Sequence, residues 1–184
     1  MKRTFGFTLT EMLFVVLIAA GILVFAVPSY KRAKERSAYE AATGLLVKLG
    51  SAVQTFEKDL QLKGFYQTAA GGTAIELDKS TLNNTSLNGV TLNAAYFQGK
   101  TIQQNLGMLI PAKYLDDFPV AGSPQLGGYK FYWLAGSKNV CGQNISAKVY
   151  MVSQDVSIAN GCYCGAAYMA DGTVKRLSGS ACTK

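Results

Sequence analysis

A run of nineteen residues without a charge, from Met12 to Tyr30, constrains this 184-residue chain more than any other feature. As a helix such a run is about 28 Å long, close to the ~30 Å hydrocarbon core of a bilayer. Cations flank both ends: Lys2 and Arg3 before the run, and Lys31, Arg32, Lys34 and Arg36 after it. The sequence therefore predicts a single membrane-spanning helix near the N-terminus, although the positive-inside rule does not choose its orientation.

Glu11 lies at the head of this apolar run, where a carboxylate is unfavourable. Insertion scales place a charged side chain at the centre of a membrane helix at about +2.5 to +3.5 kcal/mol, and at less near an end. Either the carboxylate lies among the lipid headgroups without a role, or it has a partner that offsets this free energy.

A cleaved secretory signal peptide is an alternative interpretation of the same segment. Val24 and Ala26 satisfy the small-residue rule for cleavage after Ala26. Against it, Glu11 lies within the apolar region, and Pro28 follows closely behind such a cut.

The composition argues against an enzyme. The chain has no histidine, which removes the usual general base and the commonest metal ligand. Neither a P-loop nor a convincing dinucleotide-binding glycine motif is present. The net charge of +7 would suit an anionic partner, but the cations do not form a patch interleaved with aromatic residues, as a nucleic-acid site would require. We therefore expect no catalytic residues, cofactor or metal site. Nucleic acid is a disfavoured partner, and it stays open only for a binding domain that uses its positive charge on DNA.

Four cysteines lie in the last quarter of the chain, at Cys141, Cys162, Cys164 and Cys182. An even number favours two disulfides. A four-thiolate zinc site is the alternative, but it usually shows paired CxxC motifs. Since disulfides need an oxidising compartment, we expect the C-terminal part to lie outside the cytoplasm.

The pairing of these cysteines has two candidates. Cys162 and Cys164 point to the same face of a strand and would be strained if bonded to each other. A two-residue turn at positions 171–172 would place Cys162 near Cys182. This register favours Cys162–Cys182 with Cys141–Cys164 over Cys141–Cys162 with Cys164–Cys182.

The N-terminal helix is expected to continue beyond the membrane, from about Phe7 to Leu62, with Gly64 as its cap. Lys48, Glu57 and Lys58 fall outside its apolar stripe. The stripe repeats every three or four residues: Ala38, Ala42, Leu45, Leu49, Val53, Phe56 and Leu60.

The remainder predicts an α+β head. Residues 64–107 suggest an irregular connection with short strands, and 106–115 a short helical turn. Asp116 and Asp117 either begin a turn or belong to a calcium loop. Aromatic and β-branched residues predict four antiparallel strands, at 129–135, 148–156, 162–170 and 173–177, with a tight turn at Asp171-Gly172.

The stretch KRTFGFTLTEM, followed by the apolar run, resembles the class III signal of type IV pilins and type II secretion pseudopilins. The pattern is a short basic leader, a glycine, then Phe-Thr-Leu-x-Glu in fixed register with an apolar segment. Gly6 matches the residue before the cleavage site and Phe7 the new N-terminus, while Glu11 matches the glutamate fifth after the cut. Thr10 departs from the pattern, because Ile or Val is common there. The resemblance covers roughly the first thirty residues.

The resemblance implies a leader at 1–6, a transmembrane and assembly half at 7–30, an amphipathic half at 31–62 and a globular head at 63–184. It implies cleavage between Gly6 and Phe7, N-methylation of Phe7, and pairing of Glu11 with the N-terminal amine of a neighbour. Gly21, near the usual place of a glycine in the anchor, and Pro28 mark the stretch where such helices kink or unwind in a fibre.

The implied function is that of a structural subunit in a helical filament, a type IV pilus or fimbrium, built from copies of the chain. A prepilin peptidase, an assembly ATPase and an inner-membrane platform would be its partners. It would lie in the inner membrane before assembly, and in an extracellular pilus or a periplasmic pseudopilus afterwards. A type II secretion pseudopilin and a solitary anchored or secreted binding domain are the alternatives. The cysteines near the C-terminus resemble the disulfide-bounded region of pilins more than that of major pseudopilins.

Overall fold

The longest element is α1 (Leu9–Asp59), a helix of 51 residues. The computed structural model describes residues 8–60, 71–82, 92, 94–97, 99–120, 123–153 and 164–178. The helix ends three residues before the expected end at Leu62, which lies outside these ranges together with Gly64. Clustering of contacts divides the chain into two compact units, Met1–Ser37 and Ala38–Lys184.

In the second unit, one face of α1 forms the centre of the hydrophobic core. The expected stripe is confirmed at Ala42, Leu49, Val53 and Phe56, which are buried. Leu46, which is not part of the expected stripe, is buried as well. The other members of the stripe are partly buried: Ala38, Leu45 and Leu60. The helix is therefore held by an apolar face with the spacing of an amphipathic helix.

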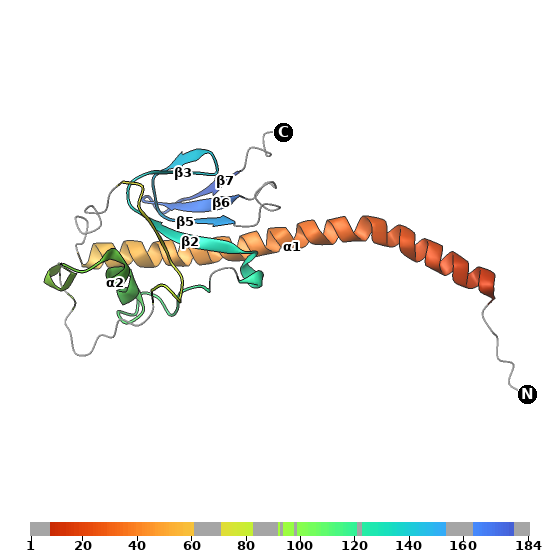
Figure 1. The fold of residues 1–184 in the computed structure, drawn as a ribbon, viewed down its shortest axis with the longest axis horizontal. Helices are drawn as coiled ribbons and strands as arrows, with labels where there is room; N and C mark the ends of the chain where they lie inside the picture. The colour runs from red at the N-terminus through yellow and green to blue at the C-terminus, as the bar shows by residue number, and fades with distance from the viewer. Residues whose placement is uncertain are drawn as a thin grey trace, which may run out of the picture. The chain divides into compact units, whose positions relative to one another are not determined.

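A five-stranded antiparallel sheet packs against α1 and confirms the α+β class (Figure 1). Its strand order is β1-β2-β5-β6-β7. All four strands expected from the sequence are present, within a few residues of their expected limits. The strands are β1 (Ala74–Glu76), β2 (Tyr129–Leu134), β5 (Ala147–Ser153), β6 (Gly165–Met169) and β7 (Val174–Leu177).

Alternation along the strands sends one set of side chains toward the helix. Tyr129, Phe131 and Trp133 of β2 belong to the same buried cluster as α1, and so do Val149 and Met151 of β5. Residues two apart in a strand share a face, so these side chains form one apolar surface beneath the helix.

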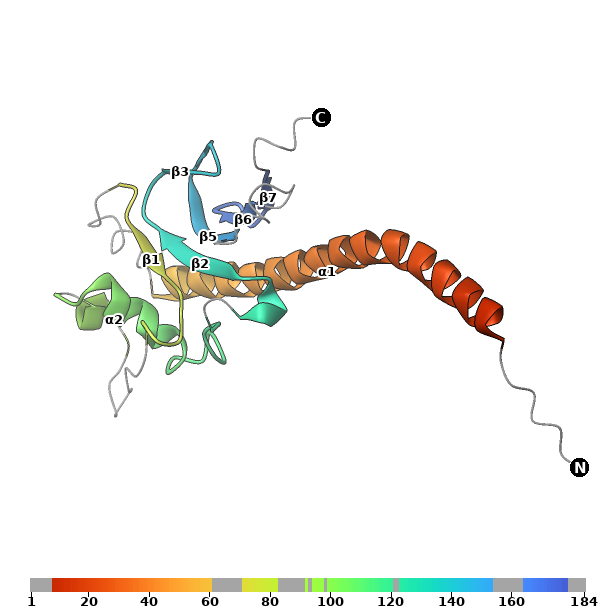
Figure 2. The same ribbon diagram turned by 45° about the vertical axis from the view of Figure 1, so that its right-hand side comes forward.

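The opposite face of the sheet has a second, smaller core beneath a hairpin that the sequence analysis did not predict. The hairpin consists of β3 (Lys138–Val140) and β4 (Gln143–Ile145), which lie over the sheet in both views (Figures 1 and 2). Val140 and Ile145 are buried there with Leu134 and Tyr150. The two strands are short and mostly polar, so their sequence carries almost no strand signal.

A short helical region covers α1 on the side away from the sheet (Figure 2). It contains η3 (Ala94–Phe97), α2 (Ile102–Leu106) and η4 (Gly107–Leu109), while a further turn, η5 (Pro124–Leu126), precedes β2. Phe56 of α1 meets Phe97 and Tyr114 edge-on, with ring centroids 5.6 and 5.2 Å apart. The part of α1 that belongs to the second unit is thus enclosed from two sides.

The turn between β6 and β7 is one residue longer than expected. Tyr168 pairs with Val174, and the Met169 nitrogen donates to the Thr173 carbonyl, so three residues rather than two form the loop. Gly172 has φ = 83°, and the Asp171 carboxylate accepts hydrogen bonds from the Thr173 nitrogen and hydroxyl. Three-residue loops of this kind commonly place glycine in the left-handed conformation. The register used to compare the cysteine pairings is therefore shifted by one residue.

Glu57 corrects another expectation, because it is 5% exposed and does not lie on the solvent side of α1. Its carboxylate accepts a hydrogen bond of 2.5 Å from the Lys148 ammonium of β5. A register shift between Ala147 and Val149 interrupts the pairing of β5 with β6 at this point. Bulges commonly redirect a side chain, and here Lys148 reaches the helix. The pairing makes the burial of Glu57 tolerable.

Candidate assembly segment

The start of α1 is a capping box built by Thr8 and Glu11. The Thr8 nitrogen and hydroxyl each donate to Glu11 Oε2 at 2.8 Å, and the Glu11 nitrogen donates to the Thr8 hydroxyl at 3.3 Å. These bonds satisfy donors that every helix leaves unpaired at its first turn.

This capping role of Glu11 was missed in the sequence analysis, although Thr-Leu-Thr-Glu before an apolar run fits the capping-box pattern S/T-x-x-E. Within the part of the chain that the structure describes, Oε1 of Glu11 accepts no hydrogen bond. One carboxylate oxygen is therefore used locally, and the other is left for a further donor.

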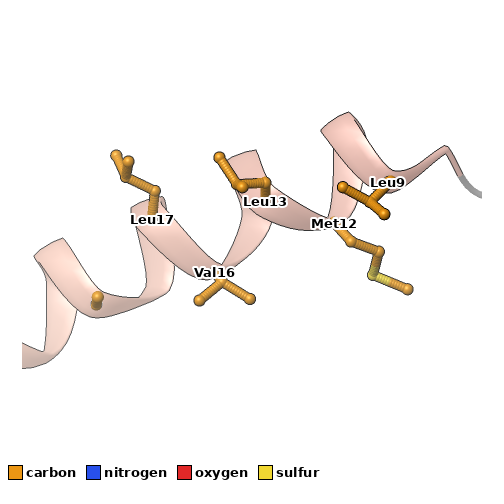
Figure 3. Close-up of a pocket in the computed structure, with 6 residues that line it drawn as sticks. Leu9, Met12, Leu13, Val16 and Leu17 are labelled. Carbon is orange, nitrogen blue, oxygen red and sulfur yellow. The ribbon is translucent and has the colours of Figure 1, made fainter.

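The apolar residues after Glu11 are exposed, which is unusual for a folded chain. Phe14 is 65% exposed and Phe25 is 79% exposed. Figure 3 shows the first turns, from which the side chains of Leu9, Met12, Leu13, Val16 and Leu17 project. A separate apolar surface on these turns is formed by Leu9, Met12, Leu13, Val16, Leu17 and Ala20. Apolar side chains that are exposed together on successive turns indicate contact with lipid or with other protein chains.

Length and composition are sufficient for α1 to cross a membrane, and its most apolar stretch is not buried within the protein. A buried core helix would not show such exposure. The helix is therefore a candidate membrane anchor.

The expected kink region lies in continuous helix. Pro28 is inside α1, where it supplies no backbone donor to the Val24 carbonyl. Nothing lies within 4 Å of a side chain built at Gly21, so this glycine is not required for packing within the described chain. Unwinding between Gly21 and Pro28 in a fibre stays a prediction.

The cleavage residues Gly6 and Phe7 lie outside the described residues, so their proposed roles are untested. Cys162 and Cys182 lie outside them as well. Cys141 and Cys164 form a disulfide, with their Cα atoms 6.3 Å apart. This bond belongs to the favoured pairing, and it excludes the alternative in which Cys141 bonds to Cys162.

The disulfide joins the turn of the β3–β4 hairpin to the start of β6. We expect its reduction to loosen the hairpin before the α1 core, because the hairpin rests on the smaller cluster alone. A disulfide commonly contributes 2 kcal/mol or more, so opening of the hairpin should rise by roughly 30-fold. Hydrogen exchange of 138–145 under reduction measures this, with peptides from 42–56 as the internal control. Equal acceleration in both regions would contradict it.

The Asp116-Asp117 pair forms ion pairs with two lysines. Lys48 binds Asp116 at 2.6 Å, and Lys79 binds Asp117 at the same distance. The hydrogen bond from Lys79 lowers the pKa of the Asp117 carboxyl. Within the described ranges, no cluster of three or more potential metal ligands is found.

Comparison with protein-family models, with curated proteins and with solved structures finds no match. The function of the chain is therefore inferred from its N-terminal segment and the geometry of that segment.

Proposed function

We propose that the chain is a structural subunit of a type IV pilin-like filament. The observation that carries this proposal is the fixed register of Gly6, Phe7 and Glu11 in front of an apolar helix whose side chains are exposed. In this proposal the chain is made with a leader at 1–6 and anchored in the inner membrane. A prepilin peptidase then cuts it between Gly6 and Phe7 and methylates the new amine.

Glu11 would act in assembly as the partner of a neighbour's N-terminus. After cleavage, each subunit carries a cationic amine at Phe7, which is unfavourable in a bilayer without a partner. A carboxylate and an ammonium attract strongly where the dielectric constant is low. The capping box supports this role, because it fixes the carboxylate while Oε1 accepts no hydrogen bond from the residues that the structure describes.

The exposed apolar surface supports a fibre of many copies. Each subunit would contact its neighbours through different patches of the helix, and such heterologous contacts continue without closing. An assembly ATPase and a membrane platform would drive the transfer from lipid into the fibre. The Cys141–Cys164 disulfide is consistent with a head outside the cytoplasm.

The proposal predicts that the mature chain begins at Phe7. The intact mass of protein purified from membranes should lack residues 1–6 and carry one additional methyl group. Gly6→Val should retain the leader, because it places a branched side chain beside the scissile bond. A mature start at Val27 would instead identify a secretory signal peptide and overturn the proposal.

A further inference from the structure

A dense group of cations follows the apolar run of α1. Lys31, Arg32, Lys34 and Arg36 lie within six residues that contain a single acidic residue, Glu35. All of them are exposed, and all belong to the first unit of the chain. The group therefore begins where the candidate membrane span ends.

Three of these cations cover a little less than half of the helix circumference. At about 100° per residue, Lys31, Arg32 and Lys34 span roughly 160° of its circumference. Tyr30, which is 70% exposed, precedes them directly. Tyrosine followed by long cationic side chains is typical of the interface between the hydrocarbon core and the headgroups.

These three side chains have no anionic partner within the described residues. Ion pairs elsewhere, such as Lys48 with Asp116, show lysines satisfied by carboxylates 2.6 Å away. Neither Lys31, Arg32 nor Lys34 forms such a contact among the residues that the structure describes. An anion outside the chain would complement them.

We propose that Lys31, Arg32 and Lys34, the basic collar, bind the phosphates of anionic glycerophospholipids. The inference rests on the proposed function only in placing the helix in a membrane with the head outside the cytoplasm. With the head outside the cytoplasm, these lipids belong to the membrane leaflet on the side of the head. The lysine ammonium groups and the arginine fork are suited to phosphate oxygens. Transfer of a subunit into a fibre would require these contacts to be released.

The test compares two variants of the full chain, each of which removes three positive charges. K31Q/R32Q/K34Q removes the collar, while K113Q/K138Q/K175Q removes exposed lysines of the head. Each protein is reconstituted in a 4:1 mixture of phosphatidylcholine and phosphatidylglycerol and then extracted in mild detergent. Native mass spectrometry gives the ratio of the two lipids retained on the protein.

Wild type and the head variant should both retain phosphatidylglycerol preferentially. At about fivefold per cation, loss of the collar should reduce this preference at least tenfold. Equal retention of the two lipids by wild type, or an unchanged preference in the collar variant, would overturn the proposal. So would an equal loss in both variants, because net charge alone would then explain it.

Filament yield separates a protein partner from lipid. A collar variant that keeps its lipid preference but no longer assembles would assign the collar to a second copy of the chain, which overturns lipid as its partner. A mature chain that does not begin at Phe7 would refute the proposed function, yet it would leave the measured lipid preference intact. The two failures are therefore distinguishable.

Discussion

Glu11→Ala is expected to leave the chain folded and inserted while filament yield falls sharply. Removal of the carboxylate lowers the free energy of insertion, so the amount of protein in the membrane should not decrease. What is lost is a charge-assisted contact worth about 1.5–3 kcal/mol, or roughly 10- to 150-fold in the equilibrium of each added subunit. Filaments sheared from cells, compared with the membrane fraction of the same cells, measure the effect.

The capping box makes it possible to separate the two roles of Glu11. Glu11→Gln keeps a side chain that caps the helix but removes the charge, because glutamine is also accepted at this position of the box. Thr8→Ala removes the capping hydroxyl but keeps the charge, at about 1 kcal/mol of helix stability.

If Glu11 pairs with a neighbour's amine, Glu11→Gln should assemble as poorly as Glu11→Ala, and Thr8→Ala should assemble better than either. Normal filaments from Glu11→Gln, together with their loss in Thr8→Ala, would assign the glutamate to capping alone. Normal filaments from all three variants would refute any assembly role.

Most of the head's architecture could be predicted because its elements carry strong periodic patterns. The apolar spacing along α1 marks the face that packs on the sheet, and alternation in β2 marks the side chains beneath it. Burial of one face of a helix or strand requires apolar residues at a regular spacing, and that spacing is visible in a single sequence.

The features that were missed depend on contacts between distant segments. The burial of Glu57 follows from a register shift in β5 that brings Lys148 to the helix. Nothing near Glu57 in the sequence reports this ion pair. The β3–β4 hairpin was missed for a related reason, since only Val140 and Ile145 of its six strand residues are buried.

The disulfide shows a correct inference from an inexact premise. The two-residue turn at 171–172 was wrong by one residue, yet Cys141 bonds to Cys164 as favoured. Strand geometry excluded only a Cys162–Cys164 bond, and the expected register chose between the two pairings that were left. A shift of one residue moves Cys162 and Cys164 together, so the register still favours Cys162 over Cys164 as the partner of Cys182.

Gly50→Val is expected to destabilise the head by about 3 kcal/mol or more. A Cβ atom at Gly50 would lie 2.2 Å from the Tyr168 ring, much closer than atoms can approach. The ring has little freedom to move, because the Tyr168 hydroxyl donates to Gln54 Oε1 at 3.1 Å and Gln54 Nε2 donates to the Ala170 carbonyl at 2.9 Å. Overpacking a core commonly costs 1–3 kcal/mol, and a β-branched side chain against a fixed ring lies at the upper end.

Gly44→Val is the matched control, since it makes the same substitution in the same helix two turns earlier. Nothing lies within 4 Å of a Cβ atom at Gly44, which is exposed, so the change should be neutral or slightly stabilising through helix propensity. Trp133 is the single tryptophan of the chain and is 1% exposed in the same core, so its fluorescence during urea unfolding reports the head directly. Equal midpoints for the two variants would show that α1 does not pack on β6 through Gly50. A midpoint lowered only in Gly50→Val would establish that this glycine sets the distance between helix and sheet.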